Sequence, residues 1–161
     1  SWVISTVLVC QSVPIFCNRG TSGIDGSTST AIGDATTSEK PTILITGDIS
    51  FFYDSNALWN KYIPKNFKII LINNSGGGIF RILPGHKENN VFNEFFETSH
   101  NLKANLLAKM YGFEYYSAND NYGLDNILNK FLNSNKQCSL LEINTPEKLN
   151  NQVLLNYFKN L

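Results

Sequence analysis

Two apolar segments that each end in a polar pair constrain the fold of this chain more than any other feature. Residues 41–46 run into a Gly-Asp pair at 47–48, and residues 67–72 run into an Asn-Asn pair at 73–74. The stretch between the pairs is long enough for a helix with its turns, so the two segments are predicted to be parallel strands of a βαβ unit. Both pairs would then lie at the carboxyl edge of one sheet, where open α/β folds bind ligands.

The residue types at this edge suit a divalent cation and a phosphate. Asp48 supplies an anionic oxygen and Asn74 a neutral one, and Mg²⁺ needs only one or two carboxylates when a diphosphate completes its shell. The glycines at 76–78 allow backbone groups to approach a phosphate or metal closely. Either pair alone is also ordinary turn chemistry, but the two at this spacing, followed by three glycines, favour a cofactor site.

Composition restricts the partners and the compartment. The chain has 161 residues, enough for one domain, and its 13 basic and 13 acidic side chains give zero net charge. This balance predicts no binding to nucleic acid and no attraction to an anionic membrane. Three cysteines without a CxxC pair indicate reduced thiols in a cytoplasmic protein. The apolar residues 1–18 are interrupted by polar ones and lack a basic start, which favours a buried edge of the fold over membrane insertion.

Apolar periodicity divides the rest of the chain into alternating strands and helices. The pattern predicts an α/β fold with a doubly wound, mainly parallel sheet and helices on both faces. Further strands are expected at 14–17, 113–116 and 138–143, helices at 27–37, 55–62, 102–110, 124–132 and 153–161, and a long irregular loop at 84–100.

Three segments together resemble a known family. They are residues 18–26 (NRGTSGIDG), 47–54 (GDISFFYD) and 73–80 (NNSGGGIF). The Gly-Asp and Asn-Asn pairs at this spacing resemble the signature of thiamine-diphosphate-dependent enzymes, in the domain that grips the diphosphate. Within that family, the flanking residues are similar to those of the menaquinone-pathway synthases, which decarboxylate 2-oxoglutarate and add its succinyl unit to isochorismate. Another 2-oxoacid decarboxylase, an acetolactate-synthase-like enzyme and a non-catalytic fragment are alternatives.

The resemblance implies a role for each matching position. Asp48, Asn74 and the backbone carbonyl of Gly76 would ligate Mg²⁺ or Mn²⁺. Arg19 would bind a substrate carboxylate, although an arginine in a loop is more commonly solvated. The residues implied to bind thiamine diphosphate are Ser22, Gly23, Ile24, Asp48, Ile49, Ser50, Asn74, Gly76 and Gly77, with Ile24 as the wedge that bends the cofactor. Those implied to form an apolar wall beside the reacting carbons are Ile79, Phe80 and Leu83, for which core packing is the alternative.

The resemblance also implies that the chain is incomplete as a catalyst. The family activates its cofactor with a glutamate from a pyrimidine-binding domain of a second subunit, and no counterpart of that motif occurs in these residues. No residue of the chain is therefore assigned a catalytic role. Residues 1–161 are expected to be the C-terminal diphosphate-binding domain of a longer homodimeric or homotetrameric enzyme, without its pyrimidine-binding and central domains, and inactive in isolation.

Overall fold

A four-stranded, wholly parallel sheet forms the centre of the fold. The computed structural model describes residues 13–18, 21, 23–85 and 87–160. Strand order is β1-β2-β4-β3, and every neighbouring pair is parallel. The strands are β1 (Ile43–Gly47), β2 (Lys68–Asn73), β3 (Glu114–Ala118) and β4 (Ser139–Asn144).

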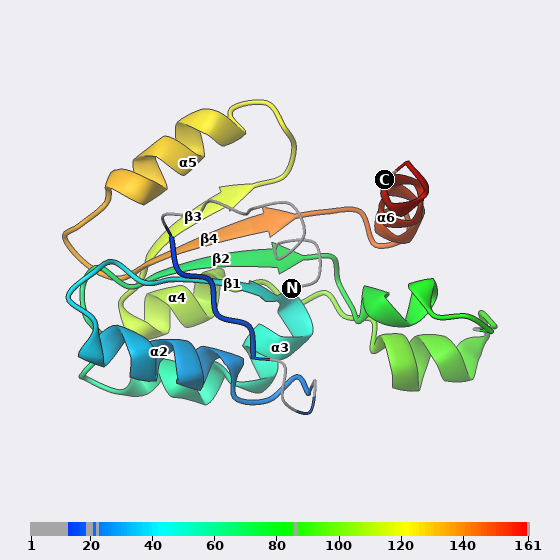
Figure 1. The fold of residues 1–161 in the computed structure, drawn as a ribbon, viewed down its shortest axis with the longest axis horizontal. Coiled ribbons are helices and arrows are strands. Elements are labelled where there is room, and N and C mark those ends of the chain that lie inside the picture. The colour runs from blue at the N-terminus through cyan, green and yellow to red at the C-terminus, as the bar shows by residue number, and fades with distance from the viewer. Residues whose placement is uncertain (1–12, 19–20, 22, 86, 161) are drawn as a thin grey trace.

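Helices cover both faces of this sheet (Figure 1). On one face, α2 (Ser27–Thr37), α3 (Asp48–Tyr53) and α4 (Asn105–Tyr111) share a core with β2 and β4 that includes Ile69, Leu71 and Leu140. On the other, α5 (Leu124–Asn133) packs on β3 and β4 through the fully buried Phe131. The doubly wound α/β arrangement expected from the sequence is therefore confirmed.

The small residues of α2 form a helix that is anchored from outside its own sequence. Asp54 accepts hydrogen bonds from the backbone N–H and the hydroxyl of Ser29, both at 2.7 Å. A carboxylate at the first turn satisfies N–H groups that have no partner within the helix and complements the helix dipole. The helix buries Thr28, Ile32 and Ala35.

This use of Asp54 explains why the helix expected at 55–62 is wrong. The segment after β1 becomes helical at once, as α3 from Asp48, and continues beyond Asp54 only as the 3₁₀ helix η1 (Ser55–Trp59). A helix that began at Ser55 would need Asp54 as its capping side chain, and that carboxylate is instead bound to Ser29 of α2. Residues 14–17 are not a strand either, because they pair with no strand of the sheet and are exposed.

Two further expectations need correction. The segment 84–100 is not wholly irregular, since it contains the π-helix η3 (Phe92–Glu97). The helix expected at 102–110 begins only at Asn105, as α4, and it packs on the core through Ala108 and the partly buried Leu107, whereas Leu106 and Met110 are exposed. The strands at 113–116 and 138–143 and the helices at 27–37 and 124–132 are confirmed within a residue or two.

The end of the described chain is α6 (Asn150–Lys159), which buries none of its residues and contacts η2 (Gly78–Ile82). Cys17 and Cys138 are free thiols, while Cys10 lies outside the described residues. Within the described ranges, none of the helices combines the length and apolar composition needed to cross a bilayer.

Candidate functional site

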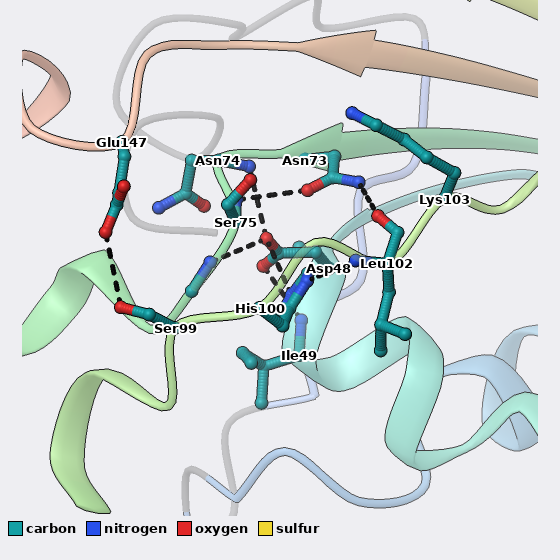
Figure 2. Close-up of polar contacts among 12 residues, drawn as sticks. Asp48, Ile49, Asn73, Asn74, Ser75, Ser99, His100, Leu102, Lys103 and Glu147 are labelled. Carbon is teal, nitrogen blue, oxygen red and sulfur yellow. Dashed lines mark hydrogen bonds and ion pairs between the residues drawn. The ribbon is translucent and has the colours of Figure 1, made fainter. Parts of the chain in front are cut away.

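Asp48 joins the carboxyl ends of the first two strands. It is the first residue of α3, directly after β1, and its side chain is 2% exposed. Oδ1 accepts a hydrogen bond from the N–H of Ile49 at 2.8 Å, whereas Oδ2 accepts from the N–H groups of Asn74 (3.1 Å) and Gly76 (3.0 Å). These contacts, seen in Figure 2, bring the two polar pairs to one edge of the sheet, as expected.

The two asparagines of the second pair have different surroundings. Asn73 is buried, and its amide donates to the carboxylate of Glu142 (2.6 Å) and the carbonyl of Leu102 (3.0 Å). Its Oδ1 accepts from the N–H of Ser75 at 3.0 Å, at a residue with a left-handed φ of 62°. Asn73 thereby fixes the turn, while the side chain of Asn74 forms no hydrogen bond within the described part of the chain and is available to a ligand.

Glu142 is the buried anion behind this turn. It lies in β4 with none of its surface exposed. Its carboxylate accepts from the Asn73 amide, the N–H of Ala104 (3.1 Å) and the hydroxyl of Tyr115 (2.6 Å). Burial and, next, the hydrogen bond to Glu142 raise the pKa of Tyr115 to about 12. Three donors explain how a charged side chain is accommodated inside the sheet layer.

The glycines of the following loop allow close approach of the chain's own backbone. The N–H of Gly77 donates to the carbonyl of Glu97 at 2.6 Å. A Cβ atom at Gly76 would lie 2.9 Å from that carbonyl oxygen, and one at Gly77 would lie 3.2 Å from the carbonyl oxygen of Phe96. The end of η3 is therefore packed directly on the loop that carries the candidate ligands.

A buried ion pair holds η3 in this position. Arg81 of η2 binds Glu97 through two hydrogen bonds of 2.5 Å, and the two side chains are 5% and 1% exposed. Glu88 joins Arg81 at 3.2 Å and Lys148 at 3.1 Å. Hydrogen bonds from Arg81 and then Lys148 lower the pKa of Glu88 to about 2, and the hydrogen bonds that Arg81 donates to Glu97 and then Glu88 raise the pKa of Arg81.

His100, which follows this segment, also reaches the site. Its backbone N–H donates to the carbonyl of Ser75 at 3.0 Å, and its Nδ1 accepts from the N–H of Leu102 at 3.1 Å. Nε2 lies 3.3 Å from Oδ2 of Asp48 (Figure 2). Sequence analysis assigned no role to His100 and missed this contact. The two residues are distant in sequence, so no local pattern signals their proximity.

The remaining predicted residues lie around this centre to differing degrees. Ser50 of α3 contacts the loop before α2, since its hydroxyl donates to the carbonyl of Ile24 at 2.8 Å. Gly23 and Ile24 belong to that exposed loop. Arg19 and Ser22 lie outside the described residues.

The expected apolar wall lies beyond the glycine loop. Ile79 and Leu83 are exposed, while Phe80 is half-buried and packs edge-on against Phe96, with ring centroids 5.9 Å apart. Phe80 and Leu83 line an open groove of ≈ 410 Å³. Ile79 does not line that groove.

The oxygen atoms at the sheet edge are suitable ligands for a hard cation such as Mg²⁺, provided that a second molecule supplies the remaining oxygen ligands. Oδ1 of Asp48 accepts one hydrogen bond, and the carbonyl of Gly76 accepts one, from the N–H of Gly78 at 3.0 Å. Each oxygen keeps a lone pair, as does the amide oxygen of Asn74. No group of three His, Cys, Asp or Glu side chains able to hold a metal occurs among the described residues. A cation here therefore needs ligands from a second molecule, as Mg²⁺ takes from a diphosphate.

An α/β domain with a carboxylate, an amide and a glycine loop at the carboxyl edge of its sheet is typical of diphosphate-binding domains. The chain belongs to the thiamine pyrophosphate enzymes, since residues 12–143 match the family described as "Thiamine pyrophosphate enzyme, C-terminal TPP binding domain".

Two relatives show which enzymes within this family the chain is similar to. The chain is 68% identical over 151 residues to the 2-succinyl-5-enolpyruvyl-6-hydroxy-3-cyclohexene-1-carboxylate synthase of Flavobacterium psychrophilum, covering 94% of this chain and 27% of that protein. It is 56% identical over 148 residues to the synthase of the same name from Christiangramia forsetii, covering 92% and 26%. The chain thus spans about a quarter of the length of the curated relatives it matches.

Solved structures agree on the fold. The thiamine diphosphate-dependent 4-hydroxybenzoylformate decarboxylase of Rhodococcus jostii RHA1 superposes with a TM-score of 0.59 at 23% identity, covering 74% of this chain and 23% of that one. The benzoylformate decarboxylase of Polynucleobacter necessarius gives 0.53 at 16% identity, covering 76% and 23%. These likenesses confirm the fold expected from the sequence.

Proposed function

We propose that this chain is the domain that binds the diphosphate and the metal in a 2-succinyl-5-enolpyruvyl-6-hydroxy-3-cyclohexene-1-carboxylate synthase. The observation that carries the proposal is the convergence of Asp48, Asn74 and Gly76 at one sheet edge, in a chain 68% identical to a synthase of that name. The cofactors are thiamine diphosphate and Mg²⁺ or Mn²⁺, and the substrates are 2-oxoglutarate and isochorismate. The enzyme works in the cytoplasm as a homodimer or homotetramer, and the isolated domain is inactive.

Different residues at the carboxyl edge of the sheet bind the cation and the diphosphate. Asp48, Asn74 and the carbonyl of Gly76 hold the cation, and the cation together with the first turn of α3 holds the diphosphate. Ile49 and Ser50 supply donors from that turn once the Ile49 N–H leaves Oδ1 of Asp48 and the Ser50 hydroxyl leaves the carbonyl of Ile24, each bonded at 2.8 Å. A role for Gly77 requires its N–H to leave the carbonyl of Glu97, with which it bonds at 2.6 Å.

The cofactor supplies the carbon–carbon chemistry, and this chain orients it and excludes water. Ile24, with Ser22 and Gly23 beside it, contacts the ring portion of the cofactor from the loop before α2. Ile79, Phe80 and Leu83 give the reacting carbons an apolar wall, which favours a decarboxylation that disperses charge. Arg19 pairs with a substrate carboxylate, for which a guanidinium is well shaped.

Calorimetric titration tests the binding function. Thiamine diphosphate with Mg²⁺ is titrated into the intact protein and into this chain, each as the natural sequence and as the Asp48→Ala, Asn74→Ala variant. The matched control is Asp34→Ala, Asn129→Ala, which removes the same groups from exposed helix positions. Binding that persists in the control and is lost in the site variant supports the proposal. Equal binding by both variants contradicts it.

Product analysis tests the activity. The intact protein is supplied with 2-oxoglutarate and isochorismate, and the product is identified by mass spectrometry. Formation of the succinyl adduct is expected. Release of the decarboxylated aldehyde without addition to isochorismate would assign the protein to the simple decarboxylases instead.

A further inference from the structure

His100 has one ring nitrogen bonded and the other buried without a partner. Nδ1 accepts from the N–H of Leu102 at 3.1 Å, which places the ring proton on Nε2. Nε2 is buried and forms no hydrogen bond of good geometry, yet it lies 3.3 Å from Oδ2 of Asp48. A buried N–H group without an acceptor is costly. The nearby carboxylate is the acceptor that a small adjustment would provide.

The two oxygens of Asp48 are held very differently. Oδ2 accepts from two backbone N–H groups, those of Asn74 and Gly76, and faces the imidazole as well. Oδ1 accepts only from the N–H of Ile49. Protein donors therefore surround Oδ2, and Oδ1 is the oxygen left for a cation.

We propose that His100 is a positioning residue for the metal site, donating from Nε2 to Oδ2 of Asp48 so that Oδ1 alone faces the cation. This inference rests on the proposed function, in which Asp48 is a metal ligand. Mg²⁺ requires near-octahedral geometry, so a carboxylate fixed in one rotation binds it better than one free to turn. Partners of a metal ligand orient it in this way in many metalloproteins.

The segment that carries His100 is rigid enough for this role. Its backbone N–H donates to the carbonyl of Ser75 at 3.0 Å. Glu97, three residues earlier, is fixed by its buried ion pair with Arg81. The ring also packs edge-on against Phe52, with centroids 5.5 Å apart and planes at 85°. The imidazole is therefore held over Asp48 from several sides.

Two substitutions separate the positioning role from a purely structural one. His100→Gln places an amide near the position of Nε2 and loses the acceptor at Nδ1. His100→Asn keeps a polar atom near Nδ1, where it can accept from Leu102, and loses the donor toward Asp48. Binding of Mn²⁺ to the intact protein with thiamine diphosphate is measured from the electron paramagnetic resonance signal of the free ion. Circular dichroism checks that both variants are folded.

We expect His100→Asn to weaken Mn²⁺ binding by about 10- to 100-fold, the usual effect of removing a partner of a metal ligand. His100→Gln should stay close to the natural protein. Binding by His100→Asn as tight as that of the natural protein overturns the inference, and so does an equal loss in both variants. Failure of the natural protein itself to bind Mn²⁺ with thiamine diphosphate refutes the proposed function, so the two failures are distinguishable.

Discussion

Replacing Asn73 by Asp tests the hydrogen-bond network beneath the candidate site. The substitution keeps the shape of the side chain and its acceptor for the N–H of Ser75, but converts the amide donor into a second carboxylate. That carboxylate would face Glu142, which now accepts from Asn73 at 2.6 Å, and the carbonyl of Leu102 at 3.0 Å. Both positions are buried, so water screens the new repulsion only weakly.

The loss of unfolding free energy caused by Asn73→Asp can be estimated from the hydrogen bonds that the substitution removes. A hydrogen bond to a charged group contributes about 1.5–3 kcal/mol, and a neutral one about 1 kcal/mol. Leaving a buried charge unpaired costs about 3–5 kcal/mol, which includes the first of these losses. We therefore expect Asn73→Asp to lower the free energy of unfolding by about 4 kcal/mol or more, a large part of the roughly 5–15 kcal/mol that stabilises a domain.

A second substitution should restore much of this loss. In the double variant Asn73→Asp, Glu142→Gln, the carboxylate and the amide exchange places and the bond between them re-forms. The oxygen of Gln at 142 can still accept from Ala104 and Tyr115. The carbonyl of Leu102 remains without its donor, so the double variant should stay about 1–3 kcal/mol below the natural chain.

Urea unfolding followed by circular dichroism measures all four proteins of this cycle. Asn101→Asp is the control, since it adds the same charge at an exposed position near Leu102 and should change stability by no more than about 0.5 kcal/mol. The reasoning is refuted if Asn73→Asp costs less than about 1 kcal/mol, because the carboxylate pair must cost more than one neutral hydrogen bond. It is also refuted if the loss in the double variant equals the sum of the single losses.

Three further predictions concern the surrounding elements. Asp54→Ala removes the carboxylate that caps α2 and should lower the urea-unfolding free energy by about 1–2 kcal/mol; no change would contradict the cap. Gly33→Ala places its methyl group in open space on α2 and should raise the free energy of unfolding by about 0.5–1 kcal/mol. Gly76→Ala should lower it, because the new Cβ would press on the carbonyl oxygen of Glu97. A stabilising Gly76→Ala together with a destabilising Gly33→Ala would contradict the close packing of η3 on the glycine loop. The raised pKa of Tyr115 should add stability that is complete below pH about 10 and lost as pH rises toward about 12, so the thermal midpoint of Tyr115→Phe should depend less on pH in that window.

Strands were predicted more successfully than helix faces, for a physical reason. The central strand β2 is buried along most of its length, so the apolar run before Asn73 identifies it without knowledge of its neighbours. The edge strand β1 is an apolar run as well, although Ile43 and Ile45 remain exposed. The periodicity of a helical segment identifies its apolar faces, but it does not show which face packs against the sheet. In α4, Leu106 and Met110 are 72% and 63% exposed, whereas Ala108 and the partly buried Leu107 pack against the core.

The centre of the candidate site was predictable because it follows from strand ends. Asp48 and Asn74 each come directly after a strand, and parallel pairing brings them together. The residues that hold them were not predictable. Glu97 at the end of η3, His100 in the segment after it and Glu142 in β4 reach the site through contacts that no local pattern encodes.

The Asn-Asn pair shows how one motif can serve two purposes. Asn73 lies on the same side of β2 as Leu71, because alternate residues of a strand share a face, and that face is the buried one. Asn74 is the first residue beyond the strand, where its side chain is released from the sheet and keeps its amide unbonded. The same substitution should therefore have different effects at the two positions: Asn73→Ala should lower stability, whereas Asn74→Ala should leave stability nearly unchanged and weaken only cation binding. The Asn-Asn motif thus contains one structural residue, Asn73, which shapes the turn, and one residue, Asn74, whose side chain the turn leaves free for the proposed cation.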